Sequence, residues 1–309
     1  MMNKNNLICD METGVCGVPG EENTTGFQML DFSKPKEKVD LYYVTDPICS
    51  HCWALEPQFR AFTERYADHL NVHTVMGGLL EKWDGFADRA NGISGPQDVA
   101  SHWREVGEHS RMPIDGSLWH TDPVTSSFIP SRVFKVVQKH NPSLAPLFLR
   151  RAREELFAFN RNISDAGVLK EIVDGIGLDG DAIVKESETP EAQQLLEEDF
   201  RTAASLGARG FPTIVLVNKN QQGVKIVGAR PLEAYEEALK QVLTEGEPKA
   251  ADTPNLQTVL GKEKRLFSKE IEVLYGIPQT EVDSFVAREL QDGSFETEEV
   301  LGETSFLQK

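Results

Sequence analysis

The sequence predicts an α/β fold built around a dithiol, Cys49-Ser-His-Cys52, that stands between a strand and a helix. Residues 39–45 are rich in β-branched and aromatic side chains, which is typical of a core strand. From Cys52 to about residue 68 apolar residues recur at helical spacing, which predicts a helix. Asp46-Pro47-Ile48 turns the chain between the two. The dithiol therefore lies at the start of the predicted helix.

This position predicts how the two thiols would react. The unpaired N–H groups and the dipole of a helix N-terminus favour the thiolate of Cys49, which would be the nucleophile, with Cys52 resolving the mixed disulfide. His51 either stabilises that thiolate or is a solvent-facing helix residue with little effect. Asp46 is either a base for the resolving thiol or a turn former. A CxxC motif alone is also found in zinc ligand pairs and among core cysteines.

A second motif lies far downstream, where Gly210-Phe-Pro212-Thr precedes the apolar run 214–217. Thioredoxin-like folds place a proline before a strand in this way, with a cis peptide bond facing the dithiol. Cis bonds are a minority even before proline, so the cis isomer of Pro212 is inferred from this resemblance and not from composition. Strand, dithiol, helix and Pro212 in this order favour a thioredoxin-like fold over a zinc pair or two core cysteines.

Between these two halves, residues from about 95 to 207 contain no convincing strand and several amphipathic helical patterns. The clearest helix has Thr189 as its N-cap, Pro190 at its first position and Gly207 as its stop. Such a helical insertion distinguishes DsbA-like proteins from plain thioredoxins. The predicted DsbA-like thioredoxin domain covers residues 39–244.

The second half of this domain is predicted as two strands, 213–217 and 223–227, joined by a polar hairpin loop. A helix from Arg230 to about residue 243 follows, and residues 245–255 read as a linker by composition.

Residues 256–309 form a different predicted module. Two short helical patterns, 268–275 and 279–290, are broken by Gly-Ile-Pro and followed by a hairpin, which predicts a winged-helix-like arrangement. This module carries six basic and eleven acidic residues, a net charge of −5. Because DNA affinity depends on neutralising phosphates, that charge opposes DNA binding and favours a role in protein contacts or packing.

The composition excludes other classes of function. The hydrophobic fraction of 39% and the charged fraction of 26% are those of an ordinary soluble protein, and no stretch is long enough to span a bilayer. A net charge of −17 opposes binding to nucleic acid and to anionic membranes. The first residues show no signal peptide, so the sequence predicts a cytoplasmic protein whose dithiol is held reduced.

Residues 1–38 are predicted to be an irregular N-terminal segment that contains Cys9 and Cys16. These two cysteines could ligate a metal, form a second disulfide or be free thiols. Zinc normally takes four nitrogen or sulfur ligands and this segment supplies no histidine, so a zinc site there would need ligands from elsewhere. No other cofactor is expected, since the chain has no Gly-rich phosphate loop.

Four stretches carry a resemblance: residues 42–57 (Tyr-Tyr-Val-Thr-Asp-Pro-Ile-Cys-Ser-His-Cys-Trp-Ala-Leu-Glu-Pro), 115–119 (Asp-Gly-Ser-Leu-Trp), Ser126-Ser127 and 268–271 (Ser-Lys-Glu-Ile). Through them most of the chain resembles the SpxH (YjbH) family of ClpXP adapters, a DsbA-like family of Gram-positive bacteria. The last motif lies in the C-terminal module, which ordinary DsbA relatives lack. The family can carry a His- and Cys-rich zinc-binding N-terminal segment, whereas this chain has only Cys9 and Cys16 there.

The resemblance implies an adapter that binds the transcription regulator Spx and promotes its degradation by the ClpXP protease. The dithiol would then be vestigial or regulatory. The alternative is a cytoplasmic thiol–disulfide oxidoreductase or isomerase whose redox site comprises Cys49, His51, Cys52 and Pro212.

Overall fold

The computed structural model describes residues 8–10, 15–17, 38–88, 91–291 and 293–309. The chain divides into two units, residues 1–36 and 37–309. In the first unit, β1 (Ile8–Asp10) and β2 (Val15–Gly17) pair as an antiparallel hairpin. The remainder of the predicted irregular segment up to residue 37 lies outside the described residues.

The second unit is built on a four-stranded sheet of order β4-β3-β5-β6. Its strands are β3 (Val39–Thr45), β4 (Leu70–Met76), β5 (Thr213–Val217) and β6 (Gly223–Val227). β3 runs parallel to β4 and antiparallel to β5, and β6 runs antiparallel to β5. The strands predicted at 39–45, 213–217 and 223–227 are confirmed with those bounds.

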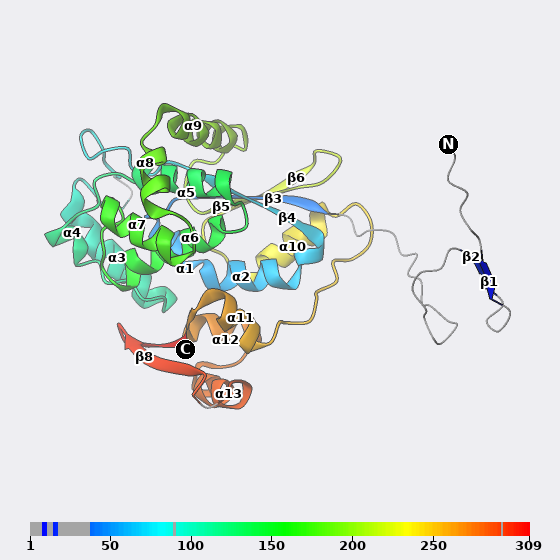
Figure 1. The fold of residues 1–309 in the computed structure, drawn as a ribbon. Helices are drawn as coiled ribbons and strands as arrows, with labels where there is room; N and C mark the ends of the chain where they lie inside the picture. The colour runs from blue at the N-terminus through cyan, green and yellow to red at the C-terminus, as the bar shows by residue number, and fades with distance from the viewer. Residues whose placement is uncertain (1–7, 11–14, 18–37, 89–90, 292) are drawn as a thin grey trace. The chain divides into compact units, whose positions relative to one another are not determined.

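Helices cover both faces of this sheet (Figure 1). The helices α2 (Glu56–Arg65) and α10 (Leu232–Val242) pack Phe62, Tyr235 and their neighbours against β3 and β5. On the opposite face, α9 (Pro190–Ser205) packs Ala203 against Val44 and Val75. The dithiol follows the carboxyl end of β3, four residues after Thr45.

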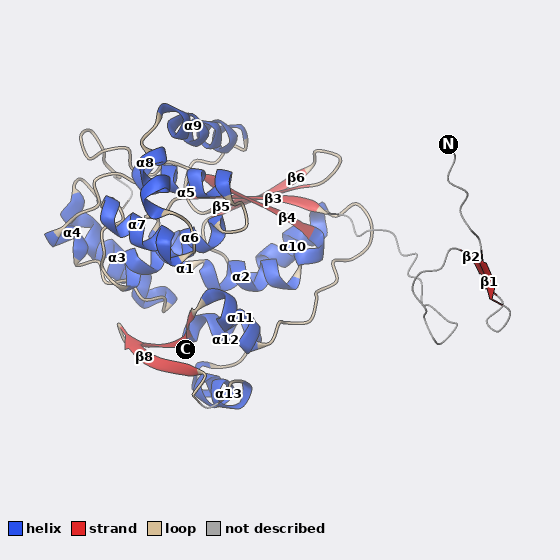
Figure 2. Cartoon of the chain, in the orientation of Figure 1, coloured by secondary structure: helices blue, strands red, loops and turns tan. Residues whose placement is uncertain are grey.

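The insertion between β4 and β5 is helical, and the described residues from 95 to 207 contain no strand (Figure 2). The side chain of Thr189 accepts a hydrogen bond from the N–H of Ala192, which confirms it as the N-cap of α9. The remaining elements of the insertion are α3 (Pro96–Ser110), α4 (Leu118–Thr121), α5 (Phe128–His140), α6 (Ala145–Arg153), the π-helical turn η2 (Glu154–Ala158), α7 (Ala166–Gly175) and α8 (Gly180–Ser187).

The single helix predicted from Cys52 to about residue 68 is wrong in its bounds. The structure has α1 (Ser50–Ala54), then α2, then the 3₁₀ turn η1 (Ala67–His69). Pro57 lies in the first turn of α2, where its missing N–H costs no hydrogen bond, so a second helix begins there.

The C-terminal module continues with helices and a three-stranded sheet of order β7-β9-β8. This element order is compatible with the winged-helix-like prediction, which remains our interpretation, and the prediction missed α11 and β7. The elements are α11 (Leu256–Glu263), β7 (Arg265–Phe267), α12 (Ser268–Tyr275), the 3₁₀ turn η3 (Gln279–Glu281), α13 (Val282–Glu289), β8 (Phe295–Val300) and β9 (Glu303–Gln308).

The predicted linker contains no helix or strand, but it is bound to the thioredoxin-like domain. The N–H of Ala251 donates to the carbonyl oxygen of Arg65 at 2.7 Å, and the N–H of Lys249 donates to Nε2 of His69 at 3.2 Å. The linker therefore follows the end of α2 and leads directly to α11.

A buried ion cluster joins the C-terminal module to the thioredoxin-like domain. Glu270 of α12 accepts two hydrogen bonds from Arg150 of α6, at 2.8 and 2.7 Å, and one from Arg60 of α2 at 3.3 Å. Arg60 also pairs with Glu263 of α11 at 2.6 Å. The Arg150 guanidinium lies 4.7 Å from the ring centre of Trp53, which directly follows Cys52. The ring of Phe267, in β7, lies edge-on to Trp53 with ring centres 5.9 Å apart, so the module also packs against the helix that carries the dithiol.

Candidate functional site

The two thiols of the dithiol are free and lie at the start of α1. Cys49 is the N-cap residue, and its Sγ accepts a hydrogen bond from the N–H of Cys52 at 3.2 Å. Cys49 is 6% exposed and Cys52 is fully buried. Cys49 therefore lies at a helix N-terminus, as predicted. Its role as the nucleophile stays a prediction.

Asp46 organises the turn that precedes the dithiol. Its carboxyl group accepts hydrogen bonds from the N–H of Ile48 at 3.0 Å, from the N–H of Leu79 at 2.7 Å and from the Ser127 hydroxyl at 2.8 Å. Burial raises the pKa of Asp46, and these hydrogen bonds work against that increase. The turn-forming alternative is therefore favoured over a base for Cys52.

His51 points away from the core and lies beside His102 of α3, with ring centres 5.4 Å apart. Burial lowers the pKa of His51, and the imidazoles of His102 and His109 lower it further. A lowered pKa keeps the imidazole neutral at neutral pH, and a neutral ring stabilises a thiolate poorly. This geometry favours the alternative in which His51 has little effect on the dithiol.

The Phe211–Pro212 peptide bond is cis, as predicted. The Phe211 ring packs against the backbone of Gly77, where an added Cβ atom would lie 1.9 Å from Cε1 of the ring. Phe211 and Cys49 line the same pocket. The redox role predicted for Pro212 stays a prediction.

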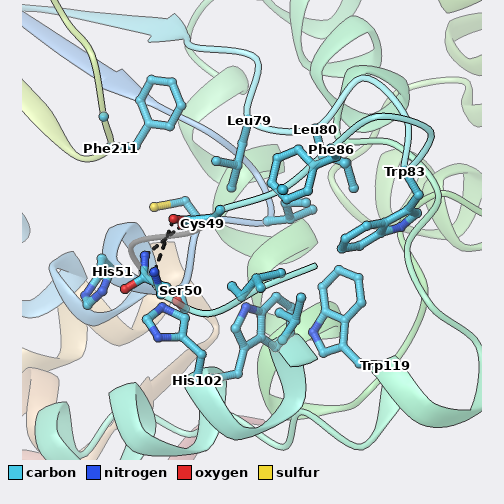
Figure 3. A pocket seen from close by; sticks show the side chains of 18 of the residues that line it. Cys49, Ser50, His51, Leu79, Leu80, Trp83, Phe86, His102, Trp119 and Phe211 are labelled. Carbon is cyan, nitrogen blue, oxygen red and sulfur yellow. Dashed lines mark hydrogen bonds between the residues drawn. The ribbon is translucent and has the colours of Figure 1, made fainter. Parts of the chain in front are cut away.

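That pocket has a volume of about 620 Å³ and opens beside the dithiol. Figure 3 shows Cys49 and Phe211 at one end and Trp83 and Trp119 at the other. Five aromatic side chains lie in the lining beside several aliphatic ones, which suits a bulky apolar group. The aromatic residues are Trp83, Phe86, Trp103, Trp119 and Phe211.

Beneath the dithiol lies Arg153, a fully buried arginine at the junction of α6 and η2. Its guanidinium donates to the carbonyl oxygen of Asp46 at 3.2 Å, to Thr45 Oγ1 and to the Glu56 carboxylate. Sequence analysis missed this residue. The one signal was an arginine next to Ala152 on the apolar side of an amphipathic helix, and the sequence could not show what it faces.

The charge of each thiol affects the pKa of the other. Burial opposes ionisation of Cys52, but a hydrogen bond from Cys49 and the positive charge of Arg153 lower its pKa overall. Burial raises the pKa of Cys49 well above its usual range, and the charge of its neighbour adds to that increase. These directions favour the anion at Cys52 and oppose the expected thiolate of Cys49, because the burial of Cys49 outweighs its place at the helix N-terminus.

The predicted metal ligands Cys9 and Cys16 lie opposite each other in the β1–β2 hairpin. Their side chains lie outside what the structure describes, so the metal site stays a prediction. Elsewhere, the described residues hold no group of three or more His, Cys, Asp or Glu side chains that could bind a metal ion. In the same part of the chain no helix is long and apolar enough to cross a membrane.

The comparison with protein families decides the family of this chain. The family described as thioredoxin matches residues 42–237, which include the dithiol, the helical insertion and the cis-proline. The chain belongs to the thioredoxin family. The match ends inside α10, before the C-terminal module.

Curated relatives match more of the chain. A protein of Halalkalibacterium halodurans named ClpXP adapter protein SpxH is 27% identical over 91% of this chain and 90% of its own length. The Bacillus subtilis protein of the same name is 28% identical over 81% of this chain and 82% of its own. The predicted resemblance to the SpxH family is confirmed. A match over 91% of the chain necessarily extends past residue 237 and into the C-terminal module.

Solved structures confirm the DsbA-type thioredoxin fold of the domain that precedes this module. A putative protein disulfide isomerase from Nitrosomonas europaea has a TM-score of 0.57 and 22% identity, over 66% of this chain and 97% of that one. A probable DsbA oxidoreductase from Streptomyces coelicolor has a TM-score of 0.52 and 20% identity, over 69% of this chain and 98% of that one. At these identities the likeness shows the fold alone.

Proposed function

We propose that this chain is an adapter that binds the transcription regulator Spx and promotes its degradation by the ClpXP protease. The observation that carries the proposal is the extent of the match to the curated adapters. The match to the Halalkalibacterium halodurans protein runs beyond the thioredoxin-family region into the C-terminal module. Each match covers most of this chain and most of the relative.

The anchoring of the C-terminal module supports this proposal. Arg60 and Arg150 of the thioredoxin-like domain are buried against Glu263 and Glu270 of the module. Such an interface holds the two parts in one fixed arrangement, so a client protein would meet a single surface made by both. The module's net charge of −5 suits protein contacts better than nucleic acid.

The proposed adapter works in the cytoplasm, where it would meet its client and the protease. That compartment keeps thiols reduced, so the dithiol would not act as a net oxidant there. The proposal therefore assigns the dithiol a regulatory or vestigial part and does not require it for delivery of the client.

A reconstituted degradation assay tests the proposal. Purified Spx, ClpXP and ATP are incubated with and without this chain, and the loss of Spx is followed by gel densitometry. We expect the chain to accelerate the loss and the folded double variant Cys49→Ala/Cys52→Ala to accelerate it as well. No acceleration by the unaltered chain would contradict the adapter function. Loss of acceleration in the double variant alone would show that the dithiol takes part.

A second candidate is a thiol–disulfide oxidoreductase or isomerase. The observation in its favour is the free Cys49 thiol at the N-cap of α1 and at the mouth of an aromatic pocket. Reduction of insulin disulfides, followed by turbidity, tests it. Dependence on Cys49 together with failure in the degradation assay would favour this candidate over the adapter.

A further inference from the structure

We propose that Arg153 is a positioning residue for the dithiol, whose buried guanidinium stabilises the thiolate form of the Cys49/Cys52 pair and so opposes oxidation to a disulfide. This role goes beyond the adapter function and does not depend on it. The experiments that test it measure the thiols themselves. Failure of the adapter function would therefore not contradict the role of Arg153, and failure of that role would not contradict the adapter function.

The position of Arg153 is fixed by the elements that carry the dithiol. One end of its guanidinium donates to Thr45 Oγ1 and to the carbonyl oxygen of Asp46, at the end of β3. The other end donates to the carboxylate of Glu56, at the start of α2, and lies 3.5 Å from the Tyr43 hydroxyl. The cation therefore sits directly under the junction between β3 and α1.

The helix that delivers Arg153 is itself distorted at this point. α6 ends at Arg153 and continues without a break as the π-helical turn η2. π-helical turns are rare and occur frequently at functional sites, because the extra residue re-aims the side chains around it. The distortion begins at Glu154, the residue that directly follows the buried arginine.

The hydrogen-bonding capacity of Arg153 is not filled by its partners. The Glu56 carboxylate balances its charge, but within the described chain Arg153 Nε is buried without a hydrogen-bond partner. The carbonyl oxygen of Asp46, which accepts from the guanidinium, also accepts from the N–H of Cys49 at 3.2 Å. Tyr43 contacts both Arg153 and the carbonyl oxygen of Cys52. A thiolate of the pair would therefore lie close to a cation whose donors are not all used.

Apart from the carboxyls of Glu56 and Asp46, the other titratable groups near the pair supply little charge at neutral pH. Burial raises the pKa of Tyr235 to about 12 and raises that of Tyr43 well above its usual range, so both phenols stay neutral. Burial lowers the pKa of His51, which keeps the imidazole neutral, and the carboxyl of Asp46 is held by its own three donors. Among the described groups acting on both thiols, Arg153 is the cation.

The chemistry affected is thiol–disulfide exchange with a small disulfide such as oxidised glutathione. One thiolate and one thiol of the pair give up two electrons as their S–S bond forms. The disulfide of glutathione breaks and accepts the two electrons. One glutathione leaves as the thiol with the single proton, and the other leaves as the thiolate. The protein disulfide carries no charge, so oxidation removes the anion beside Arg153. A stabilised thiolate therefore holds the pair in its reduced form.

The test uses the full chain with three substitutions near the dithiol. Arg153→Met removes the cation, Arg153→Lys keeps it, and Glu56→Gln removes the carboxylate that neutralises it. A nearby opposite charge lowers the pKa of an acid by about 1–3. Arg153→Met should therefore raise the thiol pKa by about 1–3, measured by thiolate absorbance at 240 nm. In glutathione buffers the same variant should shift the equilibrium towards the disulfide by about tenfold, the factor that one pKa unit represents.

The other variants separate charge from packing. Arg153→Lys should restore most of the effect, and Glu56→Gln should move the thiol pKa in the opposite direction, downwards. Arg60→Met is the matched control, because Arg60 is also a buried arginine but pairs with Glu263 and Glu270. It should cost stability and leave the thiol pKa unchanged.

Two results would overturn the inference. One is a folded Arg153→Met variant whose thiol pKa and glutathione equilibrium equal those of the unaltered chain. The other is an Arg60→Met variant that shifts the thiol pKa as much as Arg153→Met does. If Arg153→Met does not fold, Glu56→Gln decides, and a thiol pKa that fails to fall in that variant contradicts the role of Arg153.

Discussion

Removing Glu270 should release the C-terminal module from the thioredoxin-like domain. Its carboxylate is fully buried and accepts from two arginines of that domain and from the N–H of Phe267 at 3.0 Å. Glu270→Ala leaves Arg60 and Arg150 buried with fewer counter-charges. Breaking a buried ion pair in this way costs about 3–5 kcal/mol, a large part of the 5–15 kcal/mol that stabilises a typical domain.

Urea unfolding followed by tryptophan fluorescence measures this loss, because Trp53 lies against the Arg150 guanidinium. The matched control is Glu298→Ala, which breaks an ion pair with Arg265 in which the glutamate is half exposed and should cost at most about 1 kcal/mol. The double variant Arg150→Met/Glu270→Met should lose less free energy of unfolding than the two single variants lose in sum. In the double variant both charges of the pair are removed, so neither is left buried without its partner. Equal losses for Glu270→Ala and Glu298→Ala would refute the reasoning.

Four further predictions concern the dithiol, acid stability and DNA. Brief iodoacetamide labelling and peptide mapping should show faster alkylation of Cys49, which is 6% exposed, than of Cys52, which is fully buried, although burial raises the pKa of Cys49. Equal labelling would show that access does not decide which thiol reacts first. Gly77→Ala should displace the Phe211 ring and speed that alkylation, and an unchanged rate would show that the ring does not limit access. Although burial works against it, Arg60 lowers the pKa of Glu263 below 4.5. The unfolded chain therefore binds more protons than the folded chain. The stability that this pair contributes is present above pH 4.5 and is lost as the pH falls through the lower folded-state pKa. Urea unfolding between pH 3 and 7 would measure this loss. Gel shifts with duplex DNA should show no binding that weakens steeply with salt.

Local sequence patterns were enough to predict the strands next to the dithiol and next to Pro212. The β-branched and aromatic run 39–45 and the run predicted at 213–217 are neighbouring strands. The dithiol follows the first and Pro212 precedes the second, and the cis bond of Pro212 was inferred from the resemblance to thioredoxin-like folds. Thr189 and Pro190 marked the start of α9 because capping acts within one turn of the chain. These signals depend on residues close together in sequence.

The residues that sequence analysis missed act over long separations. Arg153 reaches Thr45 across 108 positions, and Arg150 reaches Glu270 across 120. An arginine in an amphipathic helix is usually solvent-exposed, and only the tertiary structure shows that these two are buried. α11 was missed for a related reason, since its buried face is completed by Leu266 and Phe306 from elsewhere in the module.

The ion cluster changes how a truncation of the C-terminal module should be understood. Ending the chain after Asn255 would remove both Glu263 and Glu270, leave Arg60 and Arg150 without these partners and expose Ala61 on α2. Loss of Spx binding in such a variant would follow from damage to the thioredoxin-like domain as readily as from loss of a client contact. Substitutions at exposed positions of the module avoid this ambiguity. Glu298→Lys reverses a charge on β8 without touching the buried cluster, so a folded Glu298→Lys variant with weaker Spx delivery would assign the defect to the module's surface.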